Sequence, residues 1–316
     1  MTWNRKHVVT IESMSREEIL TVLSVAGEYR REAMNRKPAP HHDTLKGFTA
    51  VNMFFENSTR TRISFELAEK RLGMNAIDFN APASSLSKGE SFEDTLRTVN
   101  AMNVDVLVLR HPVNGSARKA TEYFDGSVIS GGDGTHAHPT QALLDALALK
   151  ERVGTLEDLK VAIVGDILHS RVASSQACIL RKLGARVYLA GPSAFLPGAF
   201  REEWGVEGVF HTLEEALPGM DVLSLLRVQK ERMCEAEIPS FEEYYRQWGI
   251  TSDRLRRTGK KTLVMHPGPI NRGVELSGDV ADCGDSLILD QVACGVAVRM
   301  ALLSLVLGGD VRESSR

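Results

Sequence analysis

Features that mark specialised protein classes are scarce in this 316-residue chain. Its four cysteines are scattered, without a CxxC pair or a Cys/His ligand spacing, so we expect reduced thiols and neither a zinc site nor a disulfide framework. The net charge is only −3, which gives no global attraction to nucleic acid or to an anionic membrane. The N-terminal residues lack an apolar signal core, so the sequence predicts a cytoplasmic protein.

Long apolar runs are also scarce, and the one exception is residues 292–307. This run is shorter than the roughly 20 residues that a membrane-spanning helix needs, and Arg299 lies in its middle. The run therefore predicts a helix packed against a protein core. The GxGxxG fingerprint is missing as well, which argues against a dinucleotide site after Gly165-Asp166.

The chain does contain a regular alternation of apolar strands and amphipathic helices, with enough residues for two domains at about 150 residues each. Strands are predicted at 49–55, 75–79, 104–109, 127–130, 159–166 (with a turn), 186–190, 221–226 and 262–265. Helices are predicted at 15–33, 61–72, 91–102, from 139, and at 173–183. Strands separated by helices indicate crossover connections and mostly parallel sheets.

The predicted fold class is therefore α/β, with two Rossmann-like domains that each hold a mostly parallel sheet flanked by helices. We expect residues 1–138 to form the first domain, completed by a C-terminal helix at about 288–316. Residues 139–287 are expected to form the second domain.

The most distinctive segment runs from Phe54 to Arg62, where a buried strand gives way to a helix. First-turn N–H groups lack partners within the helix, and the helix dipole favours negative charge, so this junction suits a phosphate. Hydroxyl and guanidinium donors add to that preference, namely those of Ser58, Thr59, Arg60 and Thr61. A simple capped helix with solvated arginines is an equally good explanation, because Ser and Thr are common caps.

Other polar residues follow the remaining predicted strands, where ligands bind in open α/β sheets. They are Arg110, His138, Gln141, Arg171, Arg227, Gln229 and the segment His266-Pro267-Gly268-Pro269. Each has an ordinary alternative: a lone arginine is commonly a surface cation, a histidine can cap a helix, and the proline segment can be a rigid turn. Their shared location predicts that donors from both domains converge on a ligand with several negative charges.

A polar loop from Ser84 to Ser91 carries Lys88 at its tip. Its spacing fits a solvated loop before a helix cap at Ser91. If the loop is functional, Lys88 acts as a mobile charge that closes over a phosphate.

Taken in order, these segments resemble the catalytic chain of the aspartate carbamoyltransferases, and the match runs nearly end to end. The matching segments are 58–62, Ser84 with 88–90, 110–112, 138–141, Arg171, 227–229 and 267–269. The resemblance implies homotrimers, or dimers of trimers, with active sites between subunits. Lys88 and either Ser84 or Ser85 would then enter the neighbouring subunit's site. It also admits a regulatory chain or a dihydroorotase as a partner.

The implied reaction is attack by the amino group of L-aspartate on carbamoyl phosphate, which gives N-carbamoyl-L-aspartate and phosphate in pyrimidine synthesis without a metal or an organic cofactor. The resemblance assigns the phosphate to residues 58–61 and Lys88. It directs donors from Thr61, Arg110 and His138 at the carbonyl oxygen, where they stabilise developing charge. Gln141, Pro267 and Gly268 would contact the carbamoyl group. The aspartate carboxylates would bind Arg171, Arg227 and Gln229, with Lys88.

Two other functions are weighed against this one. Ornithine carbamoyltransferases share the phosphate and His-Pro-x-Gln signatures, but they typically have His-Cys-Leu-Pro where this chain has His266-Pro267-Gly268-Pro269. Their substrate also carries a side-chain cation, for which a binding segment that contains Arg227 is poorly suited. A non-catalytic scaffold subunit is the third candidate, and the presence of Arg60, Lys88 and His138 argues against it. His136 has two alternative locations: its side chain is either exposed to solvent or lines the cleft.

Overall fold

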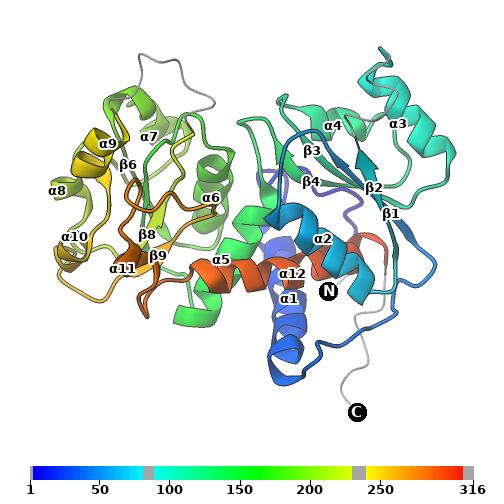
Figure 1. Cartoon of the computed structure of the whole chain (residues 1–316), viewed down its shortest axis with the longest axis horizontal. Helices are drawn as coiled ribbons and strands as arrows, with labels where there is room; N and C mark the ends of the chain where they lie inside the picture. The colour runs from blue at the N-terminus through cyan, green and yellow to red at the C-terminus, as the bar shows by residue number, and fades with distance from the viewer. Residues whose placement is uncertain (1–2, 81–88, 230–239, 309–316) are drawn as a thin grey trace. The chain divides into compact units, whose positions relative to one another are not determined.

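The computed structural model describes residues 3–80, 89–229 and 240–308 (Figure 1). The chain divides into two compact units. Unit 1 contains residues 1–147 and 292–316, and unit 2 contains residues 148–291. Because each unit has its own parallel sheet, the two are described separately.

Unit 1 holds a parallel sheet of order β2-β1-β3-β4 in its described part. The strands are β1 (Thr49–Phe54), β2 (Asn75–Asn80), β3 (Val106–His111) and β4 (Ser127–Asp133). The helices are α1 (Arg16–Asn35), α2 (Arg60–Arg71), α3 (Phe92–Ala101) and α4 (Ser116–Ala120), with the first part of α5 (Pro139–Val153) and most of α12 (Ile288–Val306).

Helices cover both faces of this sheet. On one face, α3 and α4 bury Leu96, Val99 and Ala117 against Leu107 and Leu109 of β3. On the other, Asn52 of β1 donates a hydrogen bond to Glu69 of α2. Figure 1 shows α3 and α4 above the sheet, with α2, α12 and α1 below it.

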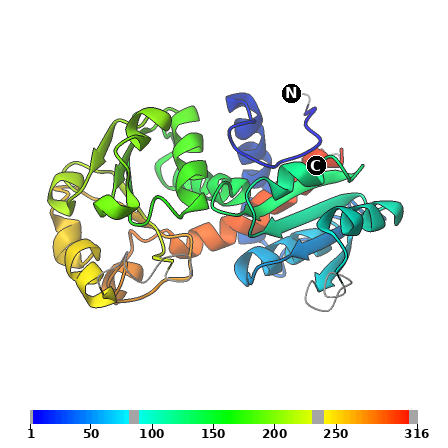
Figure 2. The same cartoon turned by 90° about the horizontal axis from the view of Figure 1, so that it is seen from above.

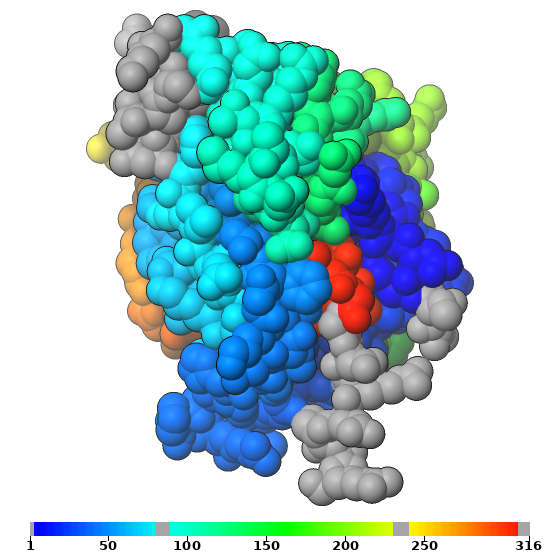
Figure 3. Space-filling model, turned by 90° about the vertical axis from the view of Figure 1, so that its right-hand side faces the viewer, coloured from blue at the N-terminus to red at the C-terminus, as the bar shows by residue number. Residues whose placement is uncertain are grey.

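Helix α12 is the apolar segment that the sequence singled out. It is long and apolar enough to cross a membrane by length and composition alone, but 67% of its most apolar window is buried inside the protein. The Tyr29 hydroxyl of α1 lies 2.9 Å from the Ser304 hydroxyl of α12. The C-terminal end of α12, red in Figure 3, reaches the surface between earlier segments of unit 1. It therefore packs as a core helix of this unit, as predicted.

Unit 2 holds a parallel sheet of order β7-β6-β5-β8-β9 in its described part. Its strands are β5 (Lys160–Val164), β6 (Arg186–Ala190), β7 (Gly208–Phe210), β8 (Val222–Leu225) and β9 (Leu263–Met265). Its helical elements are α6 (Arg171–Lys182), the 3-10 turn η3 (Ser193–Phe195), α7 (Phe200–Glu203), α8 (Leu213–Ala216), α9 (Phe241–Trp248), α10 (Ser252–Arg256) and α11 (Gly278–Ala281). Figure 2 shows α6, in green, and α9 to α11, in yellow and orange, on opposite sides of this unit.

The α/β fold class is confirmed, but several predicted boundaries differ from the structure, and three of them bear on the site. β3 continues to His111, so Arg110 lies inside the strand and does not follow it. β4 continues to Asp133, because a bulge absorbs one residue and lets pairing with β3 resume after it. α6 begins at Arg171, two residues early, because the Ser170 side chain caps it by accepting a hydrogen bond from the Ala173 N–H.

Candidate functional site

The strand order of unit 1 marks a ligand site before any side chain is considered. From β1 the chain crosses to β2 on one side, and β3 lies on the other side, so β1 and β3 form a topological switch point. Open α/β sheets bind ligands beyond the strand ends at such points. Arg60 and Thr61 begin the helix after β1, and Arg110 is the penultimate residue of β3. Unit 1 therefore brings these predicted residues to one edge of its sheet.

The N-terminus of α2 is open to an anion. Thr59 occupies the cap position, but its side chain makes no capping hydrogen bond with any described residue. Arg60 is exposed, whereas Thr61 is only 6% exposed. The Ser64 hydroxyl turns back to the carbonyls of Arg60 and Thr61, at 2.6 and 3.0 Å. Side-chain capping thus does not account for the Ser58–Thr61 segment, and the first-turn N–H groups favour an anion.

The bulge in β4 positions Arg110. Leu109 pairs with Ser130 and Arg110 with Gly132, so Gly131 is the extra residue. The Gly131 carbonyl accepts a hydrogen bond from Arg110 Nη1 at 3.1 Å, and Glu56 Oε2 lies 3.2 Å from Arg110 Nε. A Cβ on Gly131 would lie about 3.5 Å from Thr61 Cγ2 and 3.6 Å from Arg110 Cβ. Thr61 and Arg110 are therefore neighbours, as a shared carbonyl contact requires.

His138 and Gln141 belong to the start of α5. The His138 carbonyl accepts hydrogen bonds from the Gln141 and Ala142 N–H groups, and its side chain is buried. The His138 side chain is therefore held inside unit 1 at the N-terminus of α5. Gln141 Nε2 donates to Asp145 Oδ1 at 2.8 Å, which fixes the orientation of its amide group.

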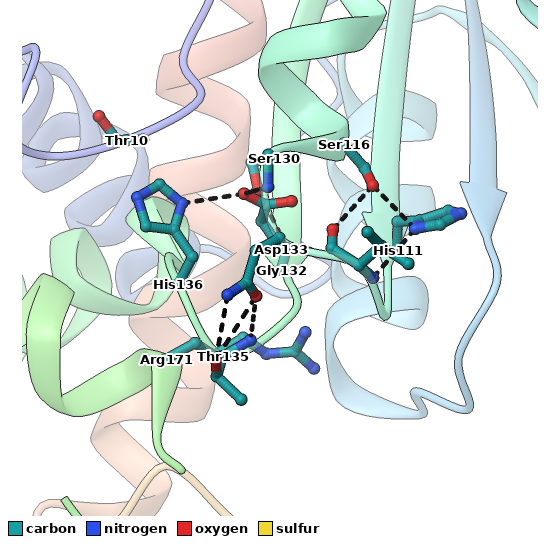
Figure 4. Close-up of polar contacts among 12 residues, drawn as sticks. Thr10, His111, Ser116, Ser130, Gly132, Asp133, Thr135, His136 and Arg171 are labelled. Carbon is teal, nitrogen blue, oxygen red and sulfur yellow. Dashed lines mark hydrogen bonds and ion pairs between the residues drawn. The ribbon is translucent and has the colours of Figure 1, made fainter. Parts of the chain in front are cut away.

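His136 is accounted for by a contact in the loop before His138 (Figure 4). Its side chain is 48% exposed, and Nδ1 lies 3.0 Å from Oδ2 of the buried Asp133. The same oxygen accepts a hydrogen bond from the Gly115 N–H at 2.9 Å. His136 therefore braces the turn between β4 and α5.

In unit 2 the switch point lies between β5 and β8. Arg171 follows β5 as the buried first residue of α6, and Arg227 and Gln229 follow β8. Gln229 Nε2 donates to the His169 carbonyl at 3.2 Å, and the His169 imidazole lies 2.9 Å from Asp166 Oδ1. Burial raises the pKa of Asp166, although the contact with His169 opposes this effect. These contacts join the segments that carry the two predicted aspartate ligands Arg171 and Gln229.

A buried glutamate, Glu275, joins two further segments of unit 2. It is 2% exposed, and its Oε1 accepts hydrogen bonds from the Val228 N–H at 3.0 Å and from Asn271 Nδ2 at 2.8 Å. Its Oε2 accepts from the Asn271 N–H at 2.8 Å and lies 3.7 Å from His266 Nε2. Val228 lies between Arg227 and Gln229, so one carboxylate holds the segments after β8 and β9.

The predicted residues Pro267 and Gly268 lie in the segment after β9 and are partly exposed. The Gly268 N–H donates to His266 Nδ1 at 2.9 Å, and Gly268 has a φ of 68°, which a side chain would disfavour. The Gly268–Pro269 peptide is cis. Ser84, Ser85 and Lys88 lie outside the described residues, so their assignments stay predictions.

Two supporting residues escaped the sequence reasoning. Glu275 belongs to no motif, but it stands alone between apolar neighbours Val274 and Leu276. Asp145 interrupts the apolar stretch of α5 four residues after Gln141. An isolated carboxylate in an apolar context was the available signal, because burying one requires compensating hydrogen bonds.

Fold and site together define a class: a two-unit parallel α/β protein with cationic and amide side chains at both switch points. Comparisons with known proteins identify the family within this class. Residues 6–151 match the family model described as the carbamoyl-P binding domain of aspartate/ornithine carbamoyltransferase, and residues 157–306 match its Asp/Orn binding domain. The chain therefore belongs to the aspartate/ornithine carbamoyltransferase family.

Individual relatives point to the aspartate branch. The aspartate carbamoyltransferase catalytic subunit of Syntrophotalea carbinolica is 47% identical over 100% of this chain and 99% of its own. Aspartate transcarbamoylase from Trypanosoma cruzi, in complex with carbamoyl phosphate, is 31% identical with a TM-score of 0.86, covering 95% of both chains. Ornithine carbamoyltransferase from Pyrococcus furiosus is 29% identical with a TM-score of 0.87, covering 98% and 99%. The backbone thus does not separate the branches, whereas sequence identity favours aspartate and confirms the resemblance.

Proposed function

We propose that this protein is an aspartate carbamoyltransferase catalytic chain, which transfers the carbamoyl group of carbamoyl phosphate to the amino group of L-aspartate and releases phosphate. The observation that carries this proposal is the placement of anion-binding side chains at the switch point of each sheet. The printed names of the relatives support the same reaction. Its product would feed pyrimidine synthesis.

Unit 1 would bind carbamoyl phosphate. The phosphate would accept hydrogen bonds from the Ser58–Thr61 segment and from the first turn of α2, which is open in this structure. Thr61, Arg110 and His138 would donate to the carbonyl oxygen as it becomes negative, and Gln141 would orient the carbamoyl NH2 group. Lys88 would add a charge to the phosphate.

Unit 2 would bind aspartate. Arg171 and Arg227 would pair with its two carboxylates, and Gln229 would donate an additional hydrogen bond. The aspartate amine must be neutral to attack. Because the protein would bind aspartate through its two carboxylates, the amine nitrogen would stay free to reach the carbonyl carbon. Pro267 and Gly268 would contact the carbamoyl group. Much of the rate would come from holding the two reactants in this geometry.

The assembly would be a homotrimer, alone or as a dimer of trimers, in which Ser84 and Lys88 complete a neighbour's site. An exposed apolar patch on unit 1 supports a self-association surface. It consists of Ile63 and Leu67, which lie four residues apart on one face of α2 and are 50% and 40% exposed. Such a patch on a folded chain is typical of an interface.

The test is to incubate the purified protein with carbamoyl phosphate and either L-aspartate or L-ornithine, and to measure the ureido product. We expect product with aspartate and none with ornithine. Product from ornithine alone would assign the chain to the other branch of the family. Product from neither amino acid, in a sample shown to be folded, would favour a non-catalytic scaffold.

A further inference from the structure

Helix α12 buries an arginine without a matching carboxylate. Arg299 is 2% exposed, and among the described residues no Asp or Glu lies within ion-pair distance of it. Its Nη1 donates to the Gly295 carbonyl at 2.8 Å, Nη2 lies 3.5 Å from Thr140 Oγ1, and Nε has no hydrogen-bond acceptor in the described part of the chain. A buried cation costs several kcal/mol unless it is compensated, so this arrangement calls for an explanation.

The location of the guanidinium gives one. Its Cζ lies 4.9 Å from the ring centroid of Phe65, which is one helical turn beyond Thr61 in α2. Thr140 lies two residues beyond His138, in the first turn of α5. Arg299 therefore contacts the second turn of α2 and the first turn of α5, the two helices whose N-termini carry proposed carbamoyl phosphate residues. The buried positive charge is therefore within two helical turns of both N-termini along the chain.

The surroundings of Arg299 keep its charge in place and leave it uncompensated. A Cβ on Gly295 would lie 2.7 Å from Arg299 Nη1, so the glycine makes room for the guanidinium within the helix. Burial, and then the like charge of Arg110, lower the pKa of Arg299 to about 9. Arg299 and Arg110 therefore repel each other in the unliganded protein, and an anion between or above them relieves that repulsion.

We propose that Arg299 is an anion-stabilising residue of the carbamoyl phosphate site, whose buried charge is compensated when the phosphate group binds. This inference rests on the function proposed above and adds a residue to it. Arg299 need not touch the substrate: its field acts through the low-dielectric interior, and its contact with Thr140 positions the first turn of α5. The residue is then a positioning and electrostatic group, distinct from the exposed Arg60.

The proposal predicts two effects of opposite sign in one variant. Arg299→Met keeps an apolar side chain of similar length and removes the charge, so the unliganded protein should melt at the same or a higher temperature than the wild type. The melting-temperature increase caused by inorganic phosphate should fall, because binding weakens by at least about tenfold, which is about 1.4 kcal/mol. Arg299→Lys, which retains a cation, should keep most of the increase.

The experiment is thermal unfolding of the full chain over a phosphate titration, followed by the carbamoylation assay. Ser304→Ala is the matched control: it alters a buried hydrogen bond on the same helix and should leave the phosphate response unchanged. An Arg299→Met protein with a wild-type phosphate response would overturn the proposal. If that variant does not fold, Arg299→Gln removes the charge while keeping a donor for the Gly295 carbonyl, and the same comparison applies. If the wild type itself forms no product, the proposed function fails instead, whatever Arg299 does.

Discussion

The proposed carbamoyl phosphate residues of unit 1 differ in how much of each side chain is exposed to solvent. Arg60 is exposed at the start of α2, where it can follow a ligand, whereas Thr61 beside it is buried and fixed. Arg110 is held on two sides by Glu56 and the Gly131 carbonyl, so its direction is set before any substrate arrives. Prearranged donors of this kind lower a barrier because they need no reorganisation during the reaction.

Arg60→Ala should lower kcat by on the order of a hundredfold or more, because a charge pair at 4 Å is worth about 4 kcal/mol at an effective dielectric near 20. The KM for aspartate should change much less. Steady-state kinetics measures both. The control is Arg62→Ala, an exposed arginine two residues on that pairs with Asp78 and is assigned no substrate contact. A near-normal kcat in Arg60→Ala would refute the phosphate role.

Glu69 should make stability depend on pH near neutrality. Burial raises its pKa from 4.5 to about 7, while a hydrogen bond from Asn52 opposes this shift. Between those two values the folded state binds more protons than the unfolded state, so the free energy of unfolding falls as pH rises through this window. Between pH 4.5 and a pH above 7, the free energy of unfolding of the wild type should fall by roughly 3 kcal/mol relative to that of Glu69→Gln, which keeps an acceptor for Asn52 Nδ2. Denaturant unfolding at a series of pH values measures it. The same pH dependence in both proteins would disprove this.

At the scale of elements, the sequence predicted most helices and strands from the spacing of apolar residues, but it did not predict features that depend on contacts with other elements. The helical range of α2 was predictable, because apolar residues recur at helical spacing and Gly73 (φ 81°) follows the last of them. Which apolar side chains are buried was not predictable: Phe65 is buried, whereas Ile63 and Leu67 are exposed. β7 escaped because its three residues, Gly208 to Phe210, include a glycine and are only partly buried, whereas the equally short β9 is apolar and buried throughout.

The candidate site was predictable in part, for the same reason. Arg110 could be assigned to a strand end from its position after an apolar run, but the bulge at Gly131 that orients it depends on pairing between β3 and β4. Glu275 was invisible because its partners, Val228 and Asn271, are brought to it only by the fold. Long-range pairing therefore decides the supporting contacts, whereas local pattern decides the elements.

Removing the Glu275 side chain should displace the two segments that it holds, one after β8 and one after β9. We expect Glu275→Ala to raise the KM for aspartate at least about tenfold and to destabilise the protein by about 3 kcal/mol, because it leaves buried donors at Val228 and Asn271 without an acceptor. Glu275→Gln retains one acceptor and should be milder. Asp282→Asn, in an exposed ion pair with Arg272, serves as the control for a lost carboxylate. Equal aspartate KM values in Glu275→Ala and Asp282→Asn would show that the carboxylate does not position the site.

At the scale of the whole molecule, each unit carries part of the proposed chemistry, and a neighbouring chain is proposed to supply the rest. The exposed apolar face of α2 that carries Ile63 and Leu67 offers a direct test. The double substitution Ile63→Lys and Leu67→Lys places charges on an exposed face, so the monomer should stay folded while self-association is lost. Light scattering after size-exclusion chromatography measures the mass, and Met34→Lys, at another exposed apolar residue, is the control. An unchanged mass in the double variant would exclude this face as the interface.

If active sites are shared between subunits, two inactive variants should restore activity when mixed. Arg60→Ala disables the site of its own chain, and Lys88→Ala disables the site that it is proposed to enter on a neighbour. After dissociation and reassembly of an equal mixture, about a quarter of the sites in closed rings would combine an intact Arg60 with an intact neighbouring Lys88. Activity should then rise to about a quarter of wild type, whereas each variant treated alone stays inactive. A mixture that reassembles, as mass measurement would establish, yet gains no activity would mean that each chain builds its site alone.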